Sequence, residues 1–65
     1  MHHVYNAHGT HEFDTIPEVI SFLRTLQANH RVRVELGTIG KRGWAESFPI
    51  EGTALGVADW LAVRH

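Results

Sequence analysis

Hydrophobic and polar residues alternate over short runs at the amino terminus, and this pattern predicts a β-hairpin. Residues 3–7 and 11–14 are the two expected strands. His8-Gly9 is the expected two-residue turn, because glycine adopts positive φ without a steric clash. With this turn, Val4 faces Phe13 on the core side of the hairpin. Tyr5 then faces Glu12 on the other side.

Apolar residues follow helical spacing after Thr15, which predicts an amphipathic helix. Thr15 is the expected N-cap, Pro17 lies in the first turn, and Glu18 completes a capping box. The helix is expected to end near Asn29-His30, where alternation returns. Its apolar stripe comprises Ile16, Val19, Ile20, Leu23 and Leu26, widened by Phe22.

The second half of the chain again predicts strands followed by a helix. Residues 32–36 alternate and predict a half-buried strand, residues 37–43 a glycine-punctuated loop, and residues 44–50 a strand broken near Pro49. Thr53 is expected to cap a helix that runs to about Val63. Gly56 costs that helix about 1 kcal/mol relative to Ala, which we expect close packing against a neighbouring element to offset. The expected buried residues of the helix are Leu55, Val57, Ala58, Leu61 and Ala62.

The two helices share a sequence pattern at an offset of 38 residues. Val19, Phe22 and Leu23 follow Thr15 at the same spacings at which Val57, Trp60 and Leu61 follow Thr53. The order is therefore ββαββα, with a hairpin–helix pseudo-repeat. We predict one α+β domain over residues 1–65, with an antiparallel sheet and both helices on one face. Strand order stays open.

The pattern also assigns residues to the two sides of this sheet. Trp60 takes the place of Phe22 in the repeat, and we therefore expect it in the core. Tyr5, Arg33 and Glu35 are expected on the sheet face that the helices leave uncovered.

Length and composition limit the possible classes of protein. A core built from 65 residues rarely supplies more than about 3–5 kcal/mol, so we expect a homodimer or a chain that acts on a larger partner. The absence of cysteine excludes disulfides and cysteine-based zinc sites. It fits a reducing compartment, and with no predicted secretory signal or membrane-spanning run we expect a cytoplasmic protein. A net charge of −1 disfavours a protein that coats nucleic acid and a strongly acidic mimic of DNA.

Histidines near the amino terminus are candidate metal ligands. The amine of Met1, two deprotonated amides and the His3 imidazole form a square-planar set suited to Cu(II) or Ni(II). Zinc could draw on His3, His8, His11 and Glu12, but the predicted hairpin puts His3 and His11 on opposite faces. We expect no bound metal and no cofactor, and keep metal binding as the third functional hypothesis.

The sequence offers little for catalysis. Ser21 and Ser47 lie in no nucleophile-elbow pattern, and the Glu12/Asp14 pair is equally typical of an exposed strand. A domain this small also has little volume for a pocket of roughly 300 Å3 or more. We therefore do not expect an enzyme.

Aromatic and basic residues instead predict a binding surface. The predicted partner-binding residues are Tyr5, Arg31, Arg33, Lys41, Arg42 and Trp44, because Tyr, Trp and Arg are enriched at interface hot spots. The first hypothesis is a small non-catalytic protein-binding module, an inhibitor or regulatory adaptor that occupies a surface of a larger protein. The alternative is a nucleic-acid-binding module that uses the basic loop 37–44 together with Arg31 and Arg33.

Residues Val34 to Leu61, a predicted hairpin and capped helix, resemble the amino-terminal dimerisation module of actinobacterial nucleoid-associated bridging proteins of the Lsr two type. The resemblance covers less than half of the chain. In its compact, cysteine-free style the chain also resembles small accessory proteins of phages and mobile elements.

Overall fold

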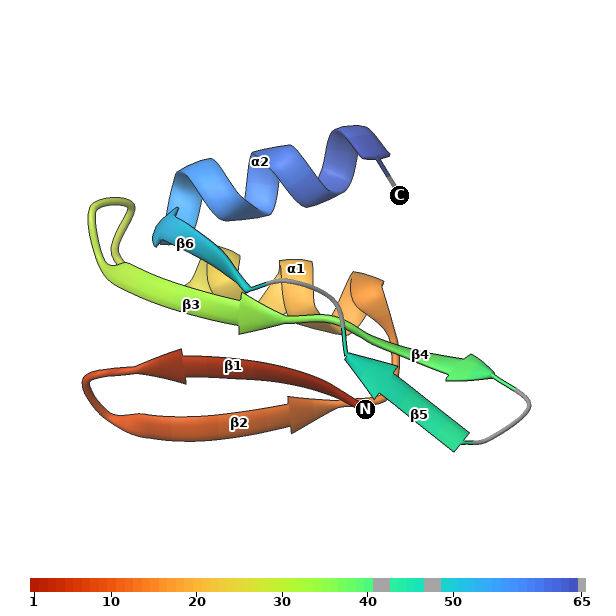
Figure 1. Ribbon diagram of the computed structural model, residues 1–65. Coiled ribbons are helices and arrows are strands. Elements are labelled where there is room, and N and C mark those ends of the chain that lie inside the picture. Colours follow the sequence, from red (N-terminus) through yellow and green to blue (C-terminus); the bar gives the residue numbers. More distant parts are fainter. Residues whose placement is uncertain (41–42, 47–48, 65) are drawn as a thin grey trace.

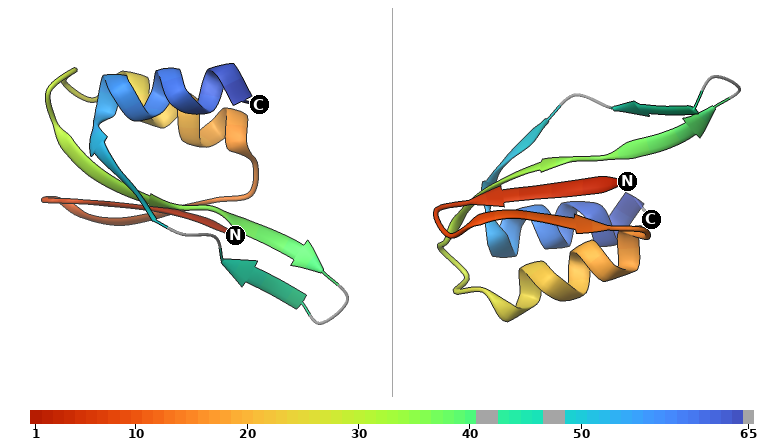
Figure 2. Two further views of the ribbon diagram at one scale, coloured as in Figure 1. Left: turned by 45° about the horizontal axis from the view of Figure 1, so that its top comes forward. Right: turned by 90° about the horizontal axis from the view of Figure 1, so that it is seen from below.

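The computed structural model describes residues 1–40, 43–46 and 49–64. Strands β1, β2, β3 and β6 form one antiparallel sheet in the order β2-β1-β3-β6, and both helices lie on the same side of it (Figures 1 and 2). The predicted α+β class and the arrangement of sheet and helices are confirmed. The elements are β1 (His2–Asn6), β2 (Gly9–Phe13), α1 (Ile16–Thr25), β3 (Arg31–Glu35), β4 (Gly37–Gly40), β5 (Gly43–Glu46), β6 (Ile50–Thr53) and α2 (Ala54–Arg64).

A separate two-stranded ribbon interrupts the second half of the fold. β4 and β5 pair with each other and extend beyond the main sheet (Figure 2). The prediction of a loop over residues 37–43 is therefore wrong for residues 37–40, and residues 41 and 42 lie outside the described residues. The strand predicted over residues 44–50, broken near Pro49, is divided between β5 and β6, which belong to different sheets. Glycines at 37, 40 and 43 favoured a loop, but cross-strand pairing holds Gly37 opposite Glu46 and Gly40 opposite Gly43.

The first hairpin turns one residue earlier than the sequence predicted. Ala7 and His8 form the turn, and Gly9 follows it with φ 127°, in the region that disfavours other residues. Tyr5 consequently lies opposite Thr10, and Val4 lies opposite His11. Because the register differs from the predicted one by an even number of residues, each side chain keeps its predicted face.

The core lies between the main sheet and the helices. Val4, Val19 and Val34 are fully buried, and Val4 and Val34 oppose each other at the centre of the β1–β3 pair. The first and second halves of the chain meet at this strand pair, which answers the strand order that the sequence left open. Together with these valines, Leu23 of α1 and Leu61 of α2 are the largest fully buried side chains among the described residues.

Both helices begin at the predicted caps. The hydroxyl of Thr53 accepts a hydrogen bond from the Gly56 N–H at 3.1 Å. At α1, the Thr15 hydroxyl accepts from the Glu18 N–H at 3.4 Å and donates to the Glu18 carboxylate at 2.8 Å. Helix α1 ends at Thr25, earlier than predicted, because Leu26 adopts an extended conformation.

Helix α2 buries a narrower face than the sequence predicted. Val57, Ala58 and Leu61 are buried as expected. Leu55 is 52 % exposed and Ala62 is also exposed, so these two predictions are wrong. The prediction of a core position for Trp60 is wrong too, because its side chain is 40 % exposed and the guanidinium carbon of Arg64 lies 3.9 Å from its ring centre.

The pattern of hydrogen bonds between strands determines which backbone groups of the two edge strands point sideways, away from the rest of the sheet. The Ala54 N–H donates to the His30 carbonyl at 2.7 Å. Since bonded and non-bonded pairs alternate in an antiparallel ladder, Val32 bonds to Gly52, while the backbone of Glu51 points away from β3. The same alternation applies to the β3–β1 and β1–β2 pairs. As a result, the backbone N–H and C=O groups of Thr10 and Glu12 in β2 point away from β1. Among the described residues, β2 and β6 are thus the edge strands of the main sheet, each paired on one side.

Candidate protein-binding site

The side of the main sheet opposite the helices, here called the open face, carries charged and aromatic side chains. Alternation along each strand puts Tyr5 on this side, and the strand register brings it next to Arg33. Arg33 in turn lies opposite Glu51 of β6. The face comprises Thr10 and Glu12 of β2, His3 and Tyr5 of β1, Arg31, Arg33 and Glu35 of β3, and Glu51 of β6.

A network of polar contacts crosses the middle of the open face. The Tyr5 hydroxyl donates to Oε2 of Glu35 at 3.2 Å, and Nη2 of Arg33 lies 3.1 Å from Oε1 of the same carboxylate. Nε of Arg33 also lies 3.9 Å from Oε1 of Glu51. The side chain of Glu35 is only 15 % exposed, and its carboxylate contacts both Tyr5 and Arg33.

A histidine extends this network towards β2. Nε2 of His3 lies 3.4 Å from Oε1 of Glu12, and its ring stacks at 6.1 Å from the ring of Tyr5. The aromatic surface of Tyr5 therefore continues into a second ring, with a carboxylate beside it.

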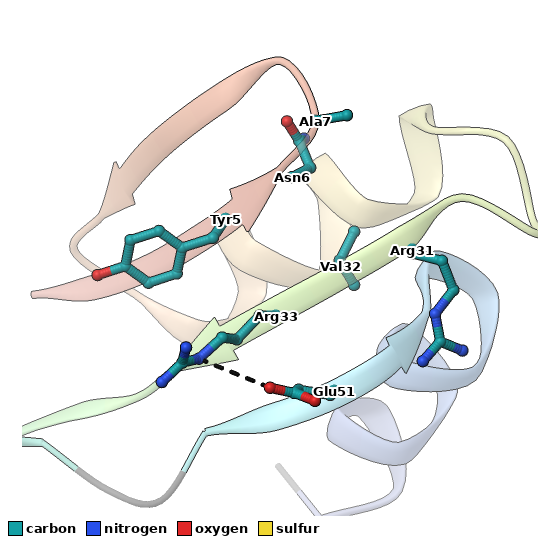
Figure 3. Close-up of a pocket in the computed structure, with 7 residues that line it drawn as sticks. All are labelled: Tyr5, Asn6, Ala7, Arg31, Val32, Arg33 and Glu51. Carbon is teal, nitrogen blue, oxygen red and sulfur yellow. Dashed lines mark ion pairs between the residues drawn. The ribbon is translucent and has the colours of Figure 1, made fainter.

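Next to Tyr5 the open face contains a shallow hollow of about 380 Å3 (Figure 3). Arg31 is exposed at its margin and forms no ion pair with any described residue. Arg33, by contrast, already faces two carboxylates. The hollow is lined by Tyr5, Asn6, Ala7, Arg31, Val32, Arg33 and Glu51.

Three of the six predicted binding residues therefore lie together around one hollow, namely Tyr5, Arg31 and Arg33. Of the other three, the structure places only the backbone of Trp44, which belongs to the β4–β5 ribbon. Trp44 has its backbone in β5, its side chain lies outside the described part of the chain, and Lys41 and Arg42 lie outside the described residues.

Sequence reasoning missed Asn6 and Glu51 as members of this site. Glu51 alternates with the partly buried Ile50, and this was a usable signal for an outward side chain. Its position beside Arg33 depends on the β3–β6 register, however, which no local pattern specifies.

The amino-terminal histidines lie in separate environments. His2 is buried, and its Nδ1 accepts a hydrogen bond from the Gly37 N–H at 3.0 Å. His8 stacks on His30 at 5.5 Å, and His11 lies 4.5 Å from the ring of Phe22. His3 and His11 lie on opposite faces, as predicted. Within the described residues there is no cluster of three or more potential metal ligands.

The proposed square-planar copper or nickel set conflicts with the strand at this end of the chain. Both His2 and His3 belong to β1, where His3 is in register with Glu12 on one side and Glu35 on the other. Metal coordination by the two backbone amides removes their protons, and with them the N–H donors that these residues bring to strand pairing.

The surface contains larger hollows than the chain length led us to expect. Besides the hollow on the open face, one of about 430 Å3 lies beside Phe13 and Phe22, and one of about 300 Å3 lies between β6 and α2. All three are open to solvent. Ser21 lines the second hollow together with Glu18 and Thr25, and none of the described residues that line it is a histidine.

Comparison with known proteins does not assign the chain to a family. No family model matches the chain, and neither a curated protein nor a solved structure is significantly similar to it. Among the described residues, neither helix has the length and apolar character needed to cross a bilayer.

Proposed function

We propose that this chain is a small non-catalytic protein-binding module, an inhibitor or regulatory adaptor that occupies a surface of a larger protein through its open face. The observation that supports it most directly is the gathering of Tyr5, Arg31 and Arg33 around one hollow on a sheet face without a helical cover. Tyrosine and arginine are the residue types that most often anchor protein interfaces.

The contacts of Tyr5 favour binding with little loss of side-chain freedom. Its hydroxyl is held by Glu35, and the same carboxylate holds Arg33. Side chains that are ordered before binding cost less entropy when a partner immobilises them. The ring of Tyr5 therefore serves as a rigid contact.

Arg31 indicates the charge of the partner. Arg33 faces two carboxylates, whereas Arg31 forms no ion pair with the described residues and lies at the margin of the hollow. A guanidinium in this position binds a carboxylate in two parallel hydrogen bonds. The partner surface is thus expected to present an Asp or Glu side chain to Arg31 and an apolar group to Tyr5.

The test begins with capture of the partner on the tagged chain, with and without nuclease, followed by calorimetry on the purified pair. Tyr5→Ala and Arg31→Ala should each weaken binding by roughly thirtyfold, which corresponds to the loss of an interface hot spot. Arg24→Ala is the matched control, because Arg24 is an exposed arginine in the last turn of α1 on the other side of the sheet. Circular dichroism spectra of all three variants should match that of the parent.

Two results would contradict the proposal. Binding that survives both Tyr5→Ala and Arg31→Ala would place the interface elsewhere. Recovery that disappears with nuclease would move the assignment to nucleic acid and to the basic loop 37–44.

A further inference from the structure

The outer edge of β6 and the adjoining side of α2 form a second surface, which shares only Glu51 with the described lining of the hollow beside Tyr5. The two elements lie side by side (Figures 1 and 2), with a hollow of about 300 Å3 between them. Glycines on both elements leave room for it, Gly52 on the strand and Gly56 on the helix. The lining residues are Ile50, Glu51, Gly52, Thr53, Gly56, Val57 and Trp60.

The hollow has an apolar wall, and the two glycines beside it leave little space for a side chain of their own. A Cβ at Gly52 would lie 3.4 Å from Cγ2 of Val57, and a Cβ at Gly56 would lie 3.0 Å from Oγ1 of Thr53. Trp60 contributes a large, 40 % exposed ring whose face is covered by the guanidinium of Arg64 at 3.9 Å. An apolar side chain from another molecule would therefore contact Val57 and the indole.

The strand edge beside this hollow offers backbone hydrogen bonds. The N–H and C=O of Glu51 point away from β3, because β6 bonds to β3 through Gly52 and Ile50. An extended polypeptide presents a donor and an acceptor at the spacing that such an edge requires.

A second copy of β6 fits this edge poorly. Symmetric antiparallel pairing centred on Glu51 puts two carboxylates opposite each other, and pairing centred on Ile50 puts Glu51 opposite Pro49, which has no N–H. Pairing centred on Gly52 puts Glu51 opposite Thr53, whose carbonyl begins the hydrogen bonding of α2. The occupant is therefore a different sequence.

We propose that the β6 edge binds an extended segment of another polypeptide with the pattern apolar–Lys/Arg–apolar. The residue opposite Glu51 shares its face, and Glu51 is 63 % exposed with only a 3.9 Å contact to Arg33, so a basic residue there complements its charge. The residues on either side of it point to the other face of the sheet. Their apolar side chains enter the hollow beside Gly52, Gly56 and Trp60.

An array of blocked pentapeptides tests this pattern against the 15N-labelled full chain. The probes are Ac-Ser-Val-X-Val-Ser-amide peptides with X as Lys, Arg, Ser or Glu. Lys and Arg peptides should shift the amide signals of residues 50–56 and the indole signal of Trp60. Exchange of Lys for Glu should weaken binding about fivefold, because a favourable cross-strand pair becomes a repulsive one. The protein variant Glu51→Lys should reverse this preference.

N-methylation of the peptide backbone separates strand addition from adhesion to the apolar hollow. A methyl group on the nitrogen of residue X removes the donor to the Glu51 carbonyl and should weaken binding about tenfold. A methyl group on the nitrogen of the following Val, which points away from β6, is the matched control and should have little effect.

Several outcomes overturn the proposal. They are the absence of shifts in β6 with every peptide, equal losses from the two N-methylated peptides, and shifts confined to the surroundings of Tyr5. Concentration-dependent shifts in β6 without peptide would overturn it in favour of a second copy. The Tyr5→Ala variant should keep its peptide binding, since Tyr5 lies on the far side of β3, and so failure of one proposed site leaves the other intact.

Discussion

His2 joins the amino-terminal strand to the start of the β4–β5 ribbon through one buried hydrogen bond. Its side chain is 7 % exposed, and Nδ1 accepts from the Gly37 N–H at 3.0 Å. His2→Ala leaves that N–H buried without its acceptor, which costs about 1–3 kcal/mol. We expect a decrease of this size in the free energy of unfolding by urea at pH 7.

The control for this prediction is His2→Asn, whose side-chain oxygen lies close to the position of Nδ1 and can accept the same bond. It should recover most of the lost stability. Equal destabilisation by Ala and Asn would show that ring packing, and not the hydrogen bond to Gly37, is what His2 contributes.

At the start of α2, the N-cap hydroxyl of Thr53 occupies the space that a side chain at Gly56 would need. The Thr53 hydroxyl accepts from the Gly56 N–H at 3.1 Å, and a Cβ at Gly56 would lie 3.0 Å from that hydroxyl. Thr53→Ala should cost about 1 kcal/mol through loss of the cap. Gly56→Ala should be nearly neutral alone, because about 1 kcal/mol of helix propensity is offset by displacement of the hydroxyl. In the Thr53→Ala background the same change should stabilise the chain.

A double-mutant cycle by chemical denaturation measures this coupling, which we expect to be about 1 kcal/mol. Additive effects of the two substitutions would contradict it. The glycine at position 56 would then serve the hollow beside β6 and not the cap.

The helices were predictable because their signals are local. Thr15 and Thr53 mark the first residues, and apolar spacing marks the buried stripe of α1. The β4–β5 ribbon was not, because the glycines at 37, 40 and 43 give no strand signal and only cross-strand pairing makes these segments strands. The prediction of a core position for Trp60 was wrong for a related reason. Its repeat partner Phe22 packs on Phe13, whereas α2 lies next to the short β6 and leaves Trp60 at its border.

The residues of the open face were predictable in part, because the alternation of side chains along a strand is also a local signal. A period of two places Tyr5, Arg33 and Glu35 on one side whatever the strand order. The contacts among them, and the addition of Glu51, require the order β1-β3-β6 and its register, which depend on packing between distant segments.

At the scale of the whole molecule, the main sheet ends at β2 and β6, neither of which pairs on its outer side with a described residue, and these two edges differ in how they suit a second copy of the chain. β2 presents the backbone groups of Thr10 and Glu12, which lie on either side of His11. Symmetric antiparallel pairing centred on His11 puts Thr10 of one copy opposite Glu12 of the other, without like charges opposite each other on the open face. We expect the homodimer predicted from chain length to form here, since β6 lacks such a symmetric register.

Glu12→Pro tests this dimer because it removes an outward-pointing N–H, which edge strands tolerate, while pairing with β1 is kept. Two intermolecular hydrogen bonds are lost per dimer, so the dimer dissociation constant measured by sedimentation equilibrium should rise about tenfold or more. Glu12→Ala is the control, because it also removes the carboxylate near His3 but keeps the N–H, and it should leave the dimer largely intact. A parent chain that sediments as a monomer at all concentrations would refute the dimer. Equal weakening by Pro and Ala would assign the interface to the side chain of Glu12 and not to the edge of β2.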